Sequence, residues 1–286
     1  MLKNTFQHIQ GIGPVIEKQI WSAGFLDWET FEKSDRSDLV LRNCENVSEI
    51  MRKSIIELNN GNPNFFSDRL PTKEHWRLFS EFRKETAYID IETNGAVQWE
   101  FMEITTIALY DGNDIRYYVQ GQNLDEFITD ISAYKVIVTY NGKTFDVPII
   151  EKHFNQKLRH AHIDLRYVLK NLGFSGGLKR CEKALGIDRK ELDGVDGFFA
   201  VLLWMEYQKY NNLKALETLL AYNIEDVVNL ETLMVAAYNR KIQETPFAAT
   251  HEMQLPDHPE FPLKPDSATI QKIKNQMARY DYFYDH

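Results

Sequence analysis

The sequence predicts an α/β fold, in which a mixed sheet is flanked by helices and preceded by a small all-α module. Two patterns carry this expectation. Three apolar runs of strand length follow one another in hairpin order, and a helical segment and a further short apolar run come after them. Beyond that run the pattern is mainly helical. The strands are expected at 87–93, 101–110, 115–120 and 135–140, and the helices at about 123–133 and over the strongly periodic stretch 213–233.

Turn-forming residues divide the chain. The stretch Asn-Asn-Gly-Asn-Pro-Asn at 59–64 is typical of a turn or linker, so we place a boundary near residue 62. Five of the nine prolines fall between Pro246 and Pro265, where proline excludes a regular helix. The expected parts are a helical module at 1–60, a linker and lead-in helix at 61–83, the α/β domain at 84–240, and a proline-rich tail at 241–286 with a short helix near 267–281.

The N-terminal module contains a glycine turn between apolar residues at helical spacing. Residues 5–31 predict a helix, a glycine hairpin and a second helix, and this order resembles a helix-hairpin-helix motif. The resemblance implies that backbone N–H groups at Gly11 and Gly13 contact a DNA phosphate, with Lys18 as the nearest cation. Residues 1–60 hold seven basic and nine acidic residues, which disfavours capture of a duplex. The alternative is a folded helical module that packs against the rest of the protein or binds a partner.

The first chemical motif is a pair of acids on a predicted strand. Asp90 and Glu92 alternate with apolar residues, and because side chains two apart on a strand share a face, both carboxylates project to the same side. Asp146 follows the strand at 135–140 and a glycine turn, in the first turn of an expected helix. An edge strand with a solvated face and a simple helix cap are the alternative interpretations of these acids.

The second motif lies in the periodic helical stretch. Tyr222 and Asp226 are four residues apart, which places them on one helix face, so the phenol can reach whatever the carboxylate binds. Ordinary helix surface is the alternative. Four carboxylates at these positions suit two Mg²⁺ or Mn²⁺ ions, which prefer hard oxygen ligands and lie roughly 3.5–4 Å apart in two-metal phosphodiesterases.

The order of these motifs resembles a known family. Asp90-x-Glu92, Asn141-Gly-Lys-Thr-Phe-Asp146 and Tyr222-x-x-x-Asp226 resemble the three exonuclease motifs of the DEDD superfamily. The tyrosine is that of the DEDDy branch, because the DEDDh branch would carry a histidine five residues before the last acid, where this chain has Ala221. Further residues over about 60–240 look like the bacterial YprB-like branch. These are Leu70-Pro71, Glu74-x-Trp76-Arg77-Leu78 and Gly176-Gly177-Leu178-Lys179-x-x-Glu182-x-x-Leu185-Gly186-Ile187.

The resemblance implies a ribonuclease H-like fold and a two-metal 3′-5′ exonuclease that removes nucleotides from single-stranded DNA or RNA. Tyr222 would orient the attacking water. The catalytic set implied is Asp90, Glu92, Asp146, Tyr222 and Asp226, and the four acids among them are the metal ligands.

Supporting residues surround this set. Asp164 resembles an acid that follows the second motif in relatives, and either supports the site from behind or caps a helix. Residues 152–190 hold ten basic and three acidic residues, which suits a polyanion, although a solvated face is an equal alternative. Further candidates for nucleic-acid binding are Asn141, Lys143, Phe145, Lys179 and Arg180.

Charge and composition narrow the class of protein. A net charge of −9 and a pI near 5.4 disfavour a general nucleic-acid coat protein. The chain shows no signal-peptide core and no apolar run of membrane-spanning length, so a cytoplasmic protein without membrane contact is expected. Two alternatives remain open: a structure-specific endonuclease that uses the same site, and a non-catalytic nucleic-acid-binding protein. The choice between DNA and RNA is open as well.

Overall fold

A five-stranded mixed sheet forms the centre of the molecule in the computed structural model, which describes residues 1–33, 47–189, 192 and 195–284, with side chains to residue 277. The strand order is β3-β2-β1-β4-β5. β1 pairs antiparallel with β2 and parallel with β4, so the sheet changes direction at its middle strand. This confirms the predicted α/β class. The strands are β1 (Thr86–Thr93), β2 (Ile104–Tyr110), β3 (Ile115–Val119), β4 (Val136–Thr139) and β5 (Ala161–Asp164).

Two strand predictions need correction. The second strand begins at Ile104 instead of residue 101, because the Asn94 side chain binds Phe101 O and Glu103 N and holds a short 3-10 turn, η5 (Trp99–Phe101), outside the sheet. β5 was not expected at all. It is four residues long, and its Ile163 pairs with Val138 of β4. A segment this short gives no clear period-two pattern.

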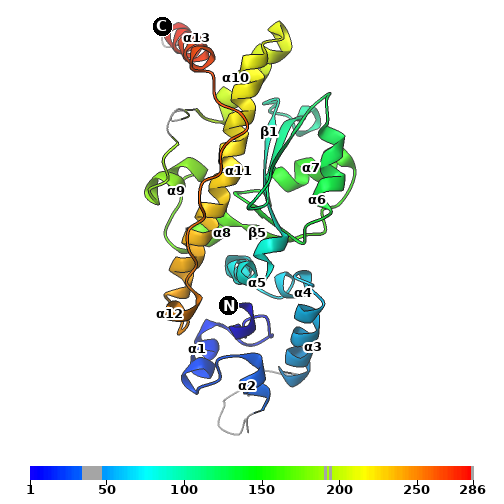
Figure 1. Cartoon of the computed structure of the whole chain (residues 1–286), viewed down its shortest axis with the longest axis vertical. Coiled ribbons are helices and arrows are strands. Elements are labelled where there is room, and N and C mark those ends of the chain that lie inside the picture. The colour runs from blue at the N-terminus through cyan, green and yellow to red at the C-terminus, as the bar shows by residue number, and fades with distance from the viewer. Residues whose placement is uncertain (34–46, 190–191, 193–194, 285–286) are drawn as a thin grey trace.

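Helices cover both faces of the sheet (Figure 1). Ile89 and Ile91 of β1 pack with α6 (Phe127–Ile131) and α7 (Asp146–Phe154) on one face. Tyr88 faces the other side, toward the long helix α11 and α8 (Leu165–Asn171). α11 spans Leu213–Ile242 and confirms the strongly periodic stretch as a helix. A shorter helix, α9 (Leu178–Ala184), lies beside α8, and η6 (Leu124–Glu126) precedes α6.

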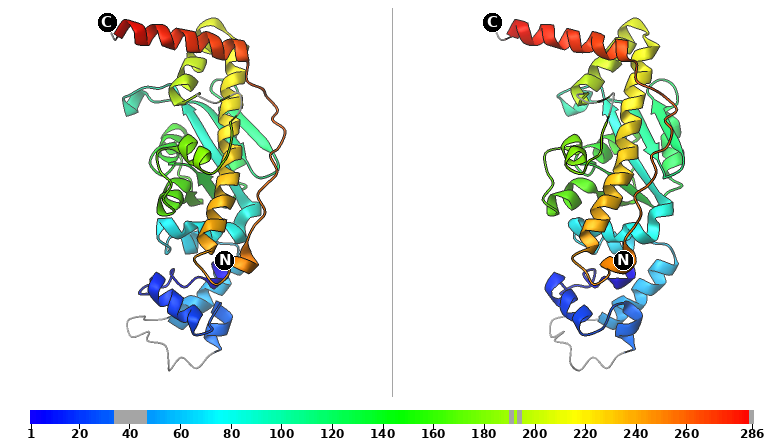
Figure 2. Two further views of the ribbon diagram at one scale, coloured as in Figure 1. Left: turned by 90° about the vertical axis from the view of Figure 1, so that its left-hand side faces the viewer. Right: turned by 60° about the vertical axis from the view of Figure 1, so that its left-hand side comes forward.

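The C-terminal tail stays with the body of the protein. After α12 (Ala248–His251) the chain has no regular structure until α13 (Ser267–Tyr284), and it runs beside α11 between these helices (Figure 2). Asp266 N–H donates to Thr218 Oγ1 at 2.9 Å, and Ile270 and Ile273 pack with α11 and α10 (Gly197–Tyr210). The expected C-terminal helix therefore forms and docks.

The N-terminal module is helical, but its first predicted helix is absent. The segment 5–13 forms turns, and the helices are η1 (Leu2–Asn4), α1 (Pro14–Ser22), α2 (Trp28–Glu32) and α3 (Val47–Asn59). The buried Glu17 carboxylate explains the difference. It accepts from Thr5 Oγ1, Phe6 N and Gln7 Nε2 at 2.9, 2.7 and 2.6 Å, so this segment wraps around an acid in place of forming helical hydrogen bonds.

The segment at 61–83, expected as a linker and lead-in helix, packs into the core. It forms the short helices α4 (Asn64–Ser67), η3 (Thr72–Leu78), α5 (Phe79–Phe82) and η4 (Arg83–Glu85). Phe66, Trp76 and Phe79 are buried there, and the Trp76 and Tyr238 rings meet edge to face. The N-terminal module thus shares one hydrophobic core with η3 and α11. Within the described part of the chain, no helix is long and apolar enough to cross a membrane.

Candidate functional site

Three predicted carboxylates meet between the central strand and the long helix. Asp90 and Glu92 point from β1 toward α11, which carries Asp226. One oxygen from each of the three side chains lies within 4.8 Å of the other two. Glu92 and Asp226 are buried and Asp90 is half-buried. The strand alternation and the helix placement together bring these acids to one point.

A buried amide that the motif analysis missed holds Asp90. Asn223 Nδ2 donates to Asp90 Oδ2 at 2.7 Å and to Asp90 O at 3.3 Å. Its own Oδ1 accepts from Thr106 Oγ1 at 3.1 Å, which joins β1, β2 and α11. The available signal was its position three residues before Asp226, on the same helix face. Asn223 therefore fixes the orientation of the Asp90 carboxylate.

Asp146 lies beside the trio without joining it. It begins α7, and its Oδ1 accepts from Ile91 N at 3.3 Å, between the two acids of β1. The loop before it is tight. Asn141 has a left-handed φ of 68°, and a Cβ at Gly142 would lie 2.3 Å from Thr139 Oγ1, so only glycine fits there.

Asp164 secures that loop. Its carboxylate accepts from Asn141 N at 2.8 Å and Lys143 N at 3.0 Å, and from Arg166 N at 3.0 Å as the N-cap of α8. Asp164 is therefore the N-cap of α8 and also holds the loop that leads to Asp146.

Tyr222 is buried one turn before Asp226 on α11. Lys179 lies over it, with Nζ 4.4 Å from the ring centroid, and also donates to Val195 O. The other binding candidates lie farther out. Phe145 and Arg180 are exposed, and Lys143 is half-buried. Gly11, Gly13 and Lys18 belong to the N-terminal module, at the opposite end of the molecule from α13 (Figure 1).

The site also contains a buried cation that no motif indicated. Arg189 donates to Asp226 Oδ1, and its Nε and Nη2 bind the Glu182 carboxylate at 2.6 and 2.8 Å. Asn229 Nδ2 in turn donates to Glu182 at 3.0 Å. The third guanidinium nitrogen, Nη1, is buried without a hydrogen-bond partner among the described residues. A single arginine in a loop carries no spacing signal, so only the fold reveals its role.

Burial and mutual repulsion act on the acids. Burial, then Asp226, Asp146 and Glu92, raise the pKa of Asp90 well above its ordinary value. The pKa of Glu92 is also raised well above its ordinary value, by burial first and then by Asp226. Burial raises the pKa of Asp146 to about 7. An all-oxygen donor set with crowded negative charge suits a divalent cation, so the residues present fit the metal that the sequence predicts.

The raised pKa of Asp146 predicts a pH-dependent penalty on folding. Below a pH of about 4 the carboxyl is protonated in both the folded and the unfolded protein, and its raised pKa has no effect on the free energy of unfolding. As the pH rises toward 7, the unfolded protein ionises this group more readily than the folded protein does, and the free energy of unfolding falls. In metal-free buffer, the unfolding free energy of the wild type should fall relative to Asp146→Asn by on the order of 3 kcal/mol between pH 4.5 and 7.5. Buried histidines titrate alike in both proteins and cancel. Urea titrations at several pH values measure this difference, and a constant difference would contradict the assignment.

Comparison with known proteins places this site in a family. A family model described as the RNase_H superfamily matches residues 87–238. Among solved structures, the chain is similar to the family B DNA polymerase from the hyperthermophilic archaeon Pyrobaculum calidifontis, with 16% identity and a TM-score of 0.41 over 55% of this chain and 24% of the polymerase chain. No curated protein matches. The family match covers more than half of the sequence and includes β1, α7 and the part of α11 that carries Tyr222 and Asp226, so the chain belongs to the RNase_H superfamily.

Proposed function

We propose that the protein is a metal-dependent 3′-5′ exonuclease of the DEDDy type, in the YprB-like branch, that hydrolyses single-stranded DNA or RNA ends. One observation carries the proposal: Asp90, Glu92 and Asp226 converge within 4.8 Å, with Tyr222 one helical turn before Asp226. Members of the superfamily are usually nucleases, which supports the same chemistry. Loss of one nucleotide at a time from the 3′ end is the activity that this site should perform.

The acids divide into two groups in this proposal. Asp90, Glu92 and Asp226 hold one divalent ion, and Asp90 with Asp146 forms the neighbourhood of a second. Bound there, Mg²⁺ or Mn²⁺ would lower the pKa of a water and polarise the scissile phosphate. The protein fixes the ligands in advance, because Asn223 holds Asp90 and Arg189 holds Asp226. Preorganised ligands need no rearrangement at the moment of reaction.

Tyr222 serves as a positioning group for water. Burial, then Asp226 and Glu92, raise the pKa of its phenol well above the ordinary value, so it stays protonated at neutral pH. A neutral phenol cannot act as the base, but it can form a hydrogen bond to the attacking water. The Lys179 ammonium over its ring helps to keep it in place.

The division into four parts is also a proposal. Residues 1–60 form a helical module, 61–83 connect it to the nuclease domain at 84–240, and the tail at 241–286 covers α11. Gly11, Gly13 and Lys18 would bind a duplex phosphate near the start of α1. Gly13 is the N-cap of that helix and offers no side-chain cap, which leaves its first N–H groups open to another acceptor.

Digestion of matched oligonucleotides tests the activity. DNA and RNA strands labelled at the 5′ end are incubated with Mg²⁺ or Mn²⁺, with Asp90→Asn as the control. A ladder that shortens from the 3′ end and is absent with the variant is expected, and the faster substrate identifies the preferred sugar. A circular single strand should stay intact, whereas its cleavage would favour an endonuclease. Binding without hydrolysis of either strand would refute the proposal.

A further inference from the structure

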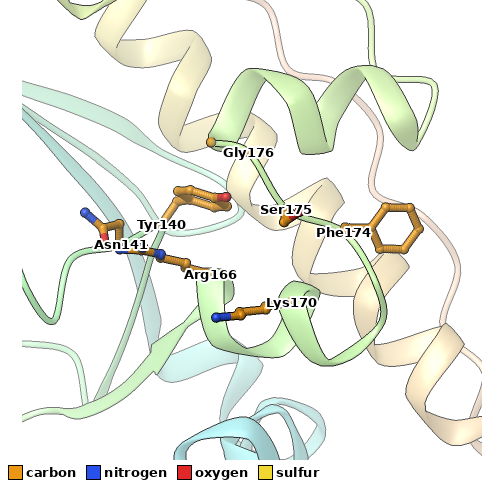
Figure 3. Close-up of a pocket in the computed structure, with 8 residues that line it drawn as sticks. Tyr140, Asn141, Arg166, Lys170, Phe174, Ser175 and Gly176 are labelled. Atoms are coloured by element: carbon orange, nitrogen blue, oxygen red, sulfur yellow. Dashed lines mark hydrogen bonds between the residues drawn. The ribbon is translucent and has the colours of Figure 1, made fainter.

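A pocket of about 460 Å³ lies between α8 and the start of α9 (Figure 3). Its walls come from the end of β4, from α8, and from the glycine-rich turn before α9. The volume is in the range of small-ligand sites. The residues that matter most are Tyr140, Asn141, Arg166, Lys170, Phe174 and Gly176.

The charge of this pocket is one-sided. Arg166 and Lys170 are exposed, one turn apart on α8, and both extend toward the side where Asn141 lies (Figure 3). None of the eight described residues that line the pocket is acidic. Arg166 Nη1 donates to the neutral Asn141 Oδ1, and neither cation has a carboxylate partner in the part of the chain that the structure describes. Two uncompensated cations attract an anion such as a phosphodiester.

The apolar part of the pocket is aromatic. Tyr140 and Phe174 are half-buried, and the Tyr140 hydroxyl lies 3.5 Å from Cys181 Sγ, which fixes the ring against α9. Gly176 has a φ of 103°, a left-handed conformation that favours glycine and lets the chain turn at the edge of the pocket. An aromatic ring beside two cations is the combination that binds a base and its phosphate in a single strand.

The position connects this pocket to the reaction centre. The loop that begins at Asn141 ends at Asp146, and Lys179, two residues after the last residue of the pocket turn, lies over the Tyr222 ring. A strand whose 3′ end lies at the carboxylates would therefore pass this pocket with its next nucleotides. The 141–146 loop and the start of α9 thus link the pocket to the carboxylates.

We infer that this pocket binds an internal nucleotide of the substrate strand, on the 5′ side of the bond that is cleaved, with Arg166 and Lys170 on its phosphate and Tyr140 against its base. The inference rests on the proposed nuclease function for the identity of the strand. It predicts that affinity and turnover increase once a substrate is long enough to reach the pocket.

Binding is measured in the Asp90→Asn background without divalent metal, so that it does not depend on hydrolysis. The probe is a fluorescent single-stranded decamer. Lys170→Gln is the main variant because the Lys170 ammonium makes no hydrogen bond or ion pair with the residues that the structure describes. Its Kd should rise about three- to tenfold, and the slope of log K against log salt should fall by about 0.7. Lys183→Gln, which removes an exposed charge from α9 outside the pocket, should change the Kd by less than about twofold.

Turnover supplies the second readout. In the otherwise wild-type protein, the kcat/KM advantage of a decamer over a dinucleotide should shrink about tenfold in Lys170→Gln with Arg166→Gln, and persist with Lys183→Gln. An unchanged Kd in Lys170→Gln would show that the pocket does not bind the strand. If a free mononucleotide bound as tightly as the decamer, and lost affinity in Lys170→Gln, the pocket would bind nucleotides that are not part of the strand. A strand that binds through Lys170 but is never hydrolysed would refute the exonuclease and leave the pocket standing.

Discussion

The substitutions Asp90→Asn and Asp226→Asn are expected to abolish turnover alike, while only Asp90→Asn raises the thermal stability of the metal-free protein. Each carboxylate belongs to the cluster that would hold the metal. Loss of one such ligand should lower kcat by at least about a thousandfold, equivalent to roughly 4 kcal/mol of transition-state stabilisation. Stability then separates the two variants.

In the absence of metal, the Asp90 carboxylate lowers the stability of the folded protein. Burial and the neighbouring acids raise the pKa of its carboxyl, and its hydrogen-bond donor, Asn223, is neutral. An asparagine keeps an oxygen for that hydrogen bond and removes the repulsion. Active-site substitutions of this kind commonly stabilise by about 0.5–2 kcal/mol. The melting temperature of Asp90→Asn should therefore rise by about 2–5 °C.

Asp226 differs because it has a cationic partner. Arg189 is buried beside it, and removal of the carboxylate leaves Glu182 as the guanidinium's ion-pair partner among the described residues. The loss of attraction to Arg189 opposes the relief of repulsion from Asp90 and Glu92. No gain in melting temperature is expected for Asp226→Asn, since a buried charge that loses a partner is costly.

Calorimetry in EDTA, run beside the oligonucleotide assay, measures both effects. Glu103 is an exposed acid that directly precedes β2, and Glu103→Gln is the control that should change neither activity nor melting temperature. Measurable turnover in either variant would remove that residue from the catalytic set. Equal stabilisation by both substitutions would mean that Arg189 does not offset the charge of Asp226.

The parts of the site that the sequence predicts are those that depend on local periodicity. Two-residue alternation on β1 places Asp90 and Glu92 on one face, and four-residue spacing on α11 aligns Tyr222 with Asp226. The mixed sheet follows from the order of its elements for the same reason. These periodicities are the same wherever the strand or helix lies in the fold, so they can be predicted without knowledge of contacts between distant segments.

What escaped prediction depends on contacts between distant segments. Arg189 reaches Asp226 across 37 residues and Asn223 reaches Asp90 across 133. The helix expected before Gly11 is absent because Glu17, more than a turn further on, captures the backbone of Phe6. Neither spacing nor composition encodes such partners in one sequence, since any buried polar group needs a partner and many candidates exist.

The largest expected effect on stability lies far from the reaction centre, at Arg77. Its guanidinium binds Glu17 Oε2 at 2.9 Å, Glu74 Oε2 at 2.9 Å and Thr5 Oγ1 at 2.9 Å, and its side chain is 4% exposed. These contacts join α1 to η3 and so connect the N-terminal module to the segment that leads into the RNase_H superfamily domain. The substitution Arg77→Met should lower the unfolding free energy by about 3–5 kcal/mol, because it leaves two buried carboxylates without their cation.

Arg116→Met is the matched control for Arg77→Met, because it removes the same charge from a half-exposed pair with Asp130, 3.5 Å apart, and should cost at most about 1 kcal/mol. The double variant Arg77→Met with Glu17→Gln should recover part of the loss, since the two residues stabilise each other. Urea unfolding measures all three proteins. Because the module and the RNase_H superfamily domain share one core, Arg77→Met should unfold in a single weakened transition. If the module instead unfolded at a lower urea concentration while the domain stayed folded, the two would be separate folding units that the ion pairs only hold together.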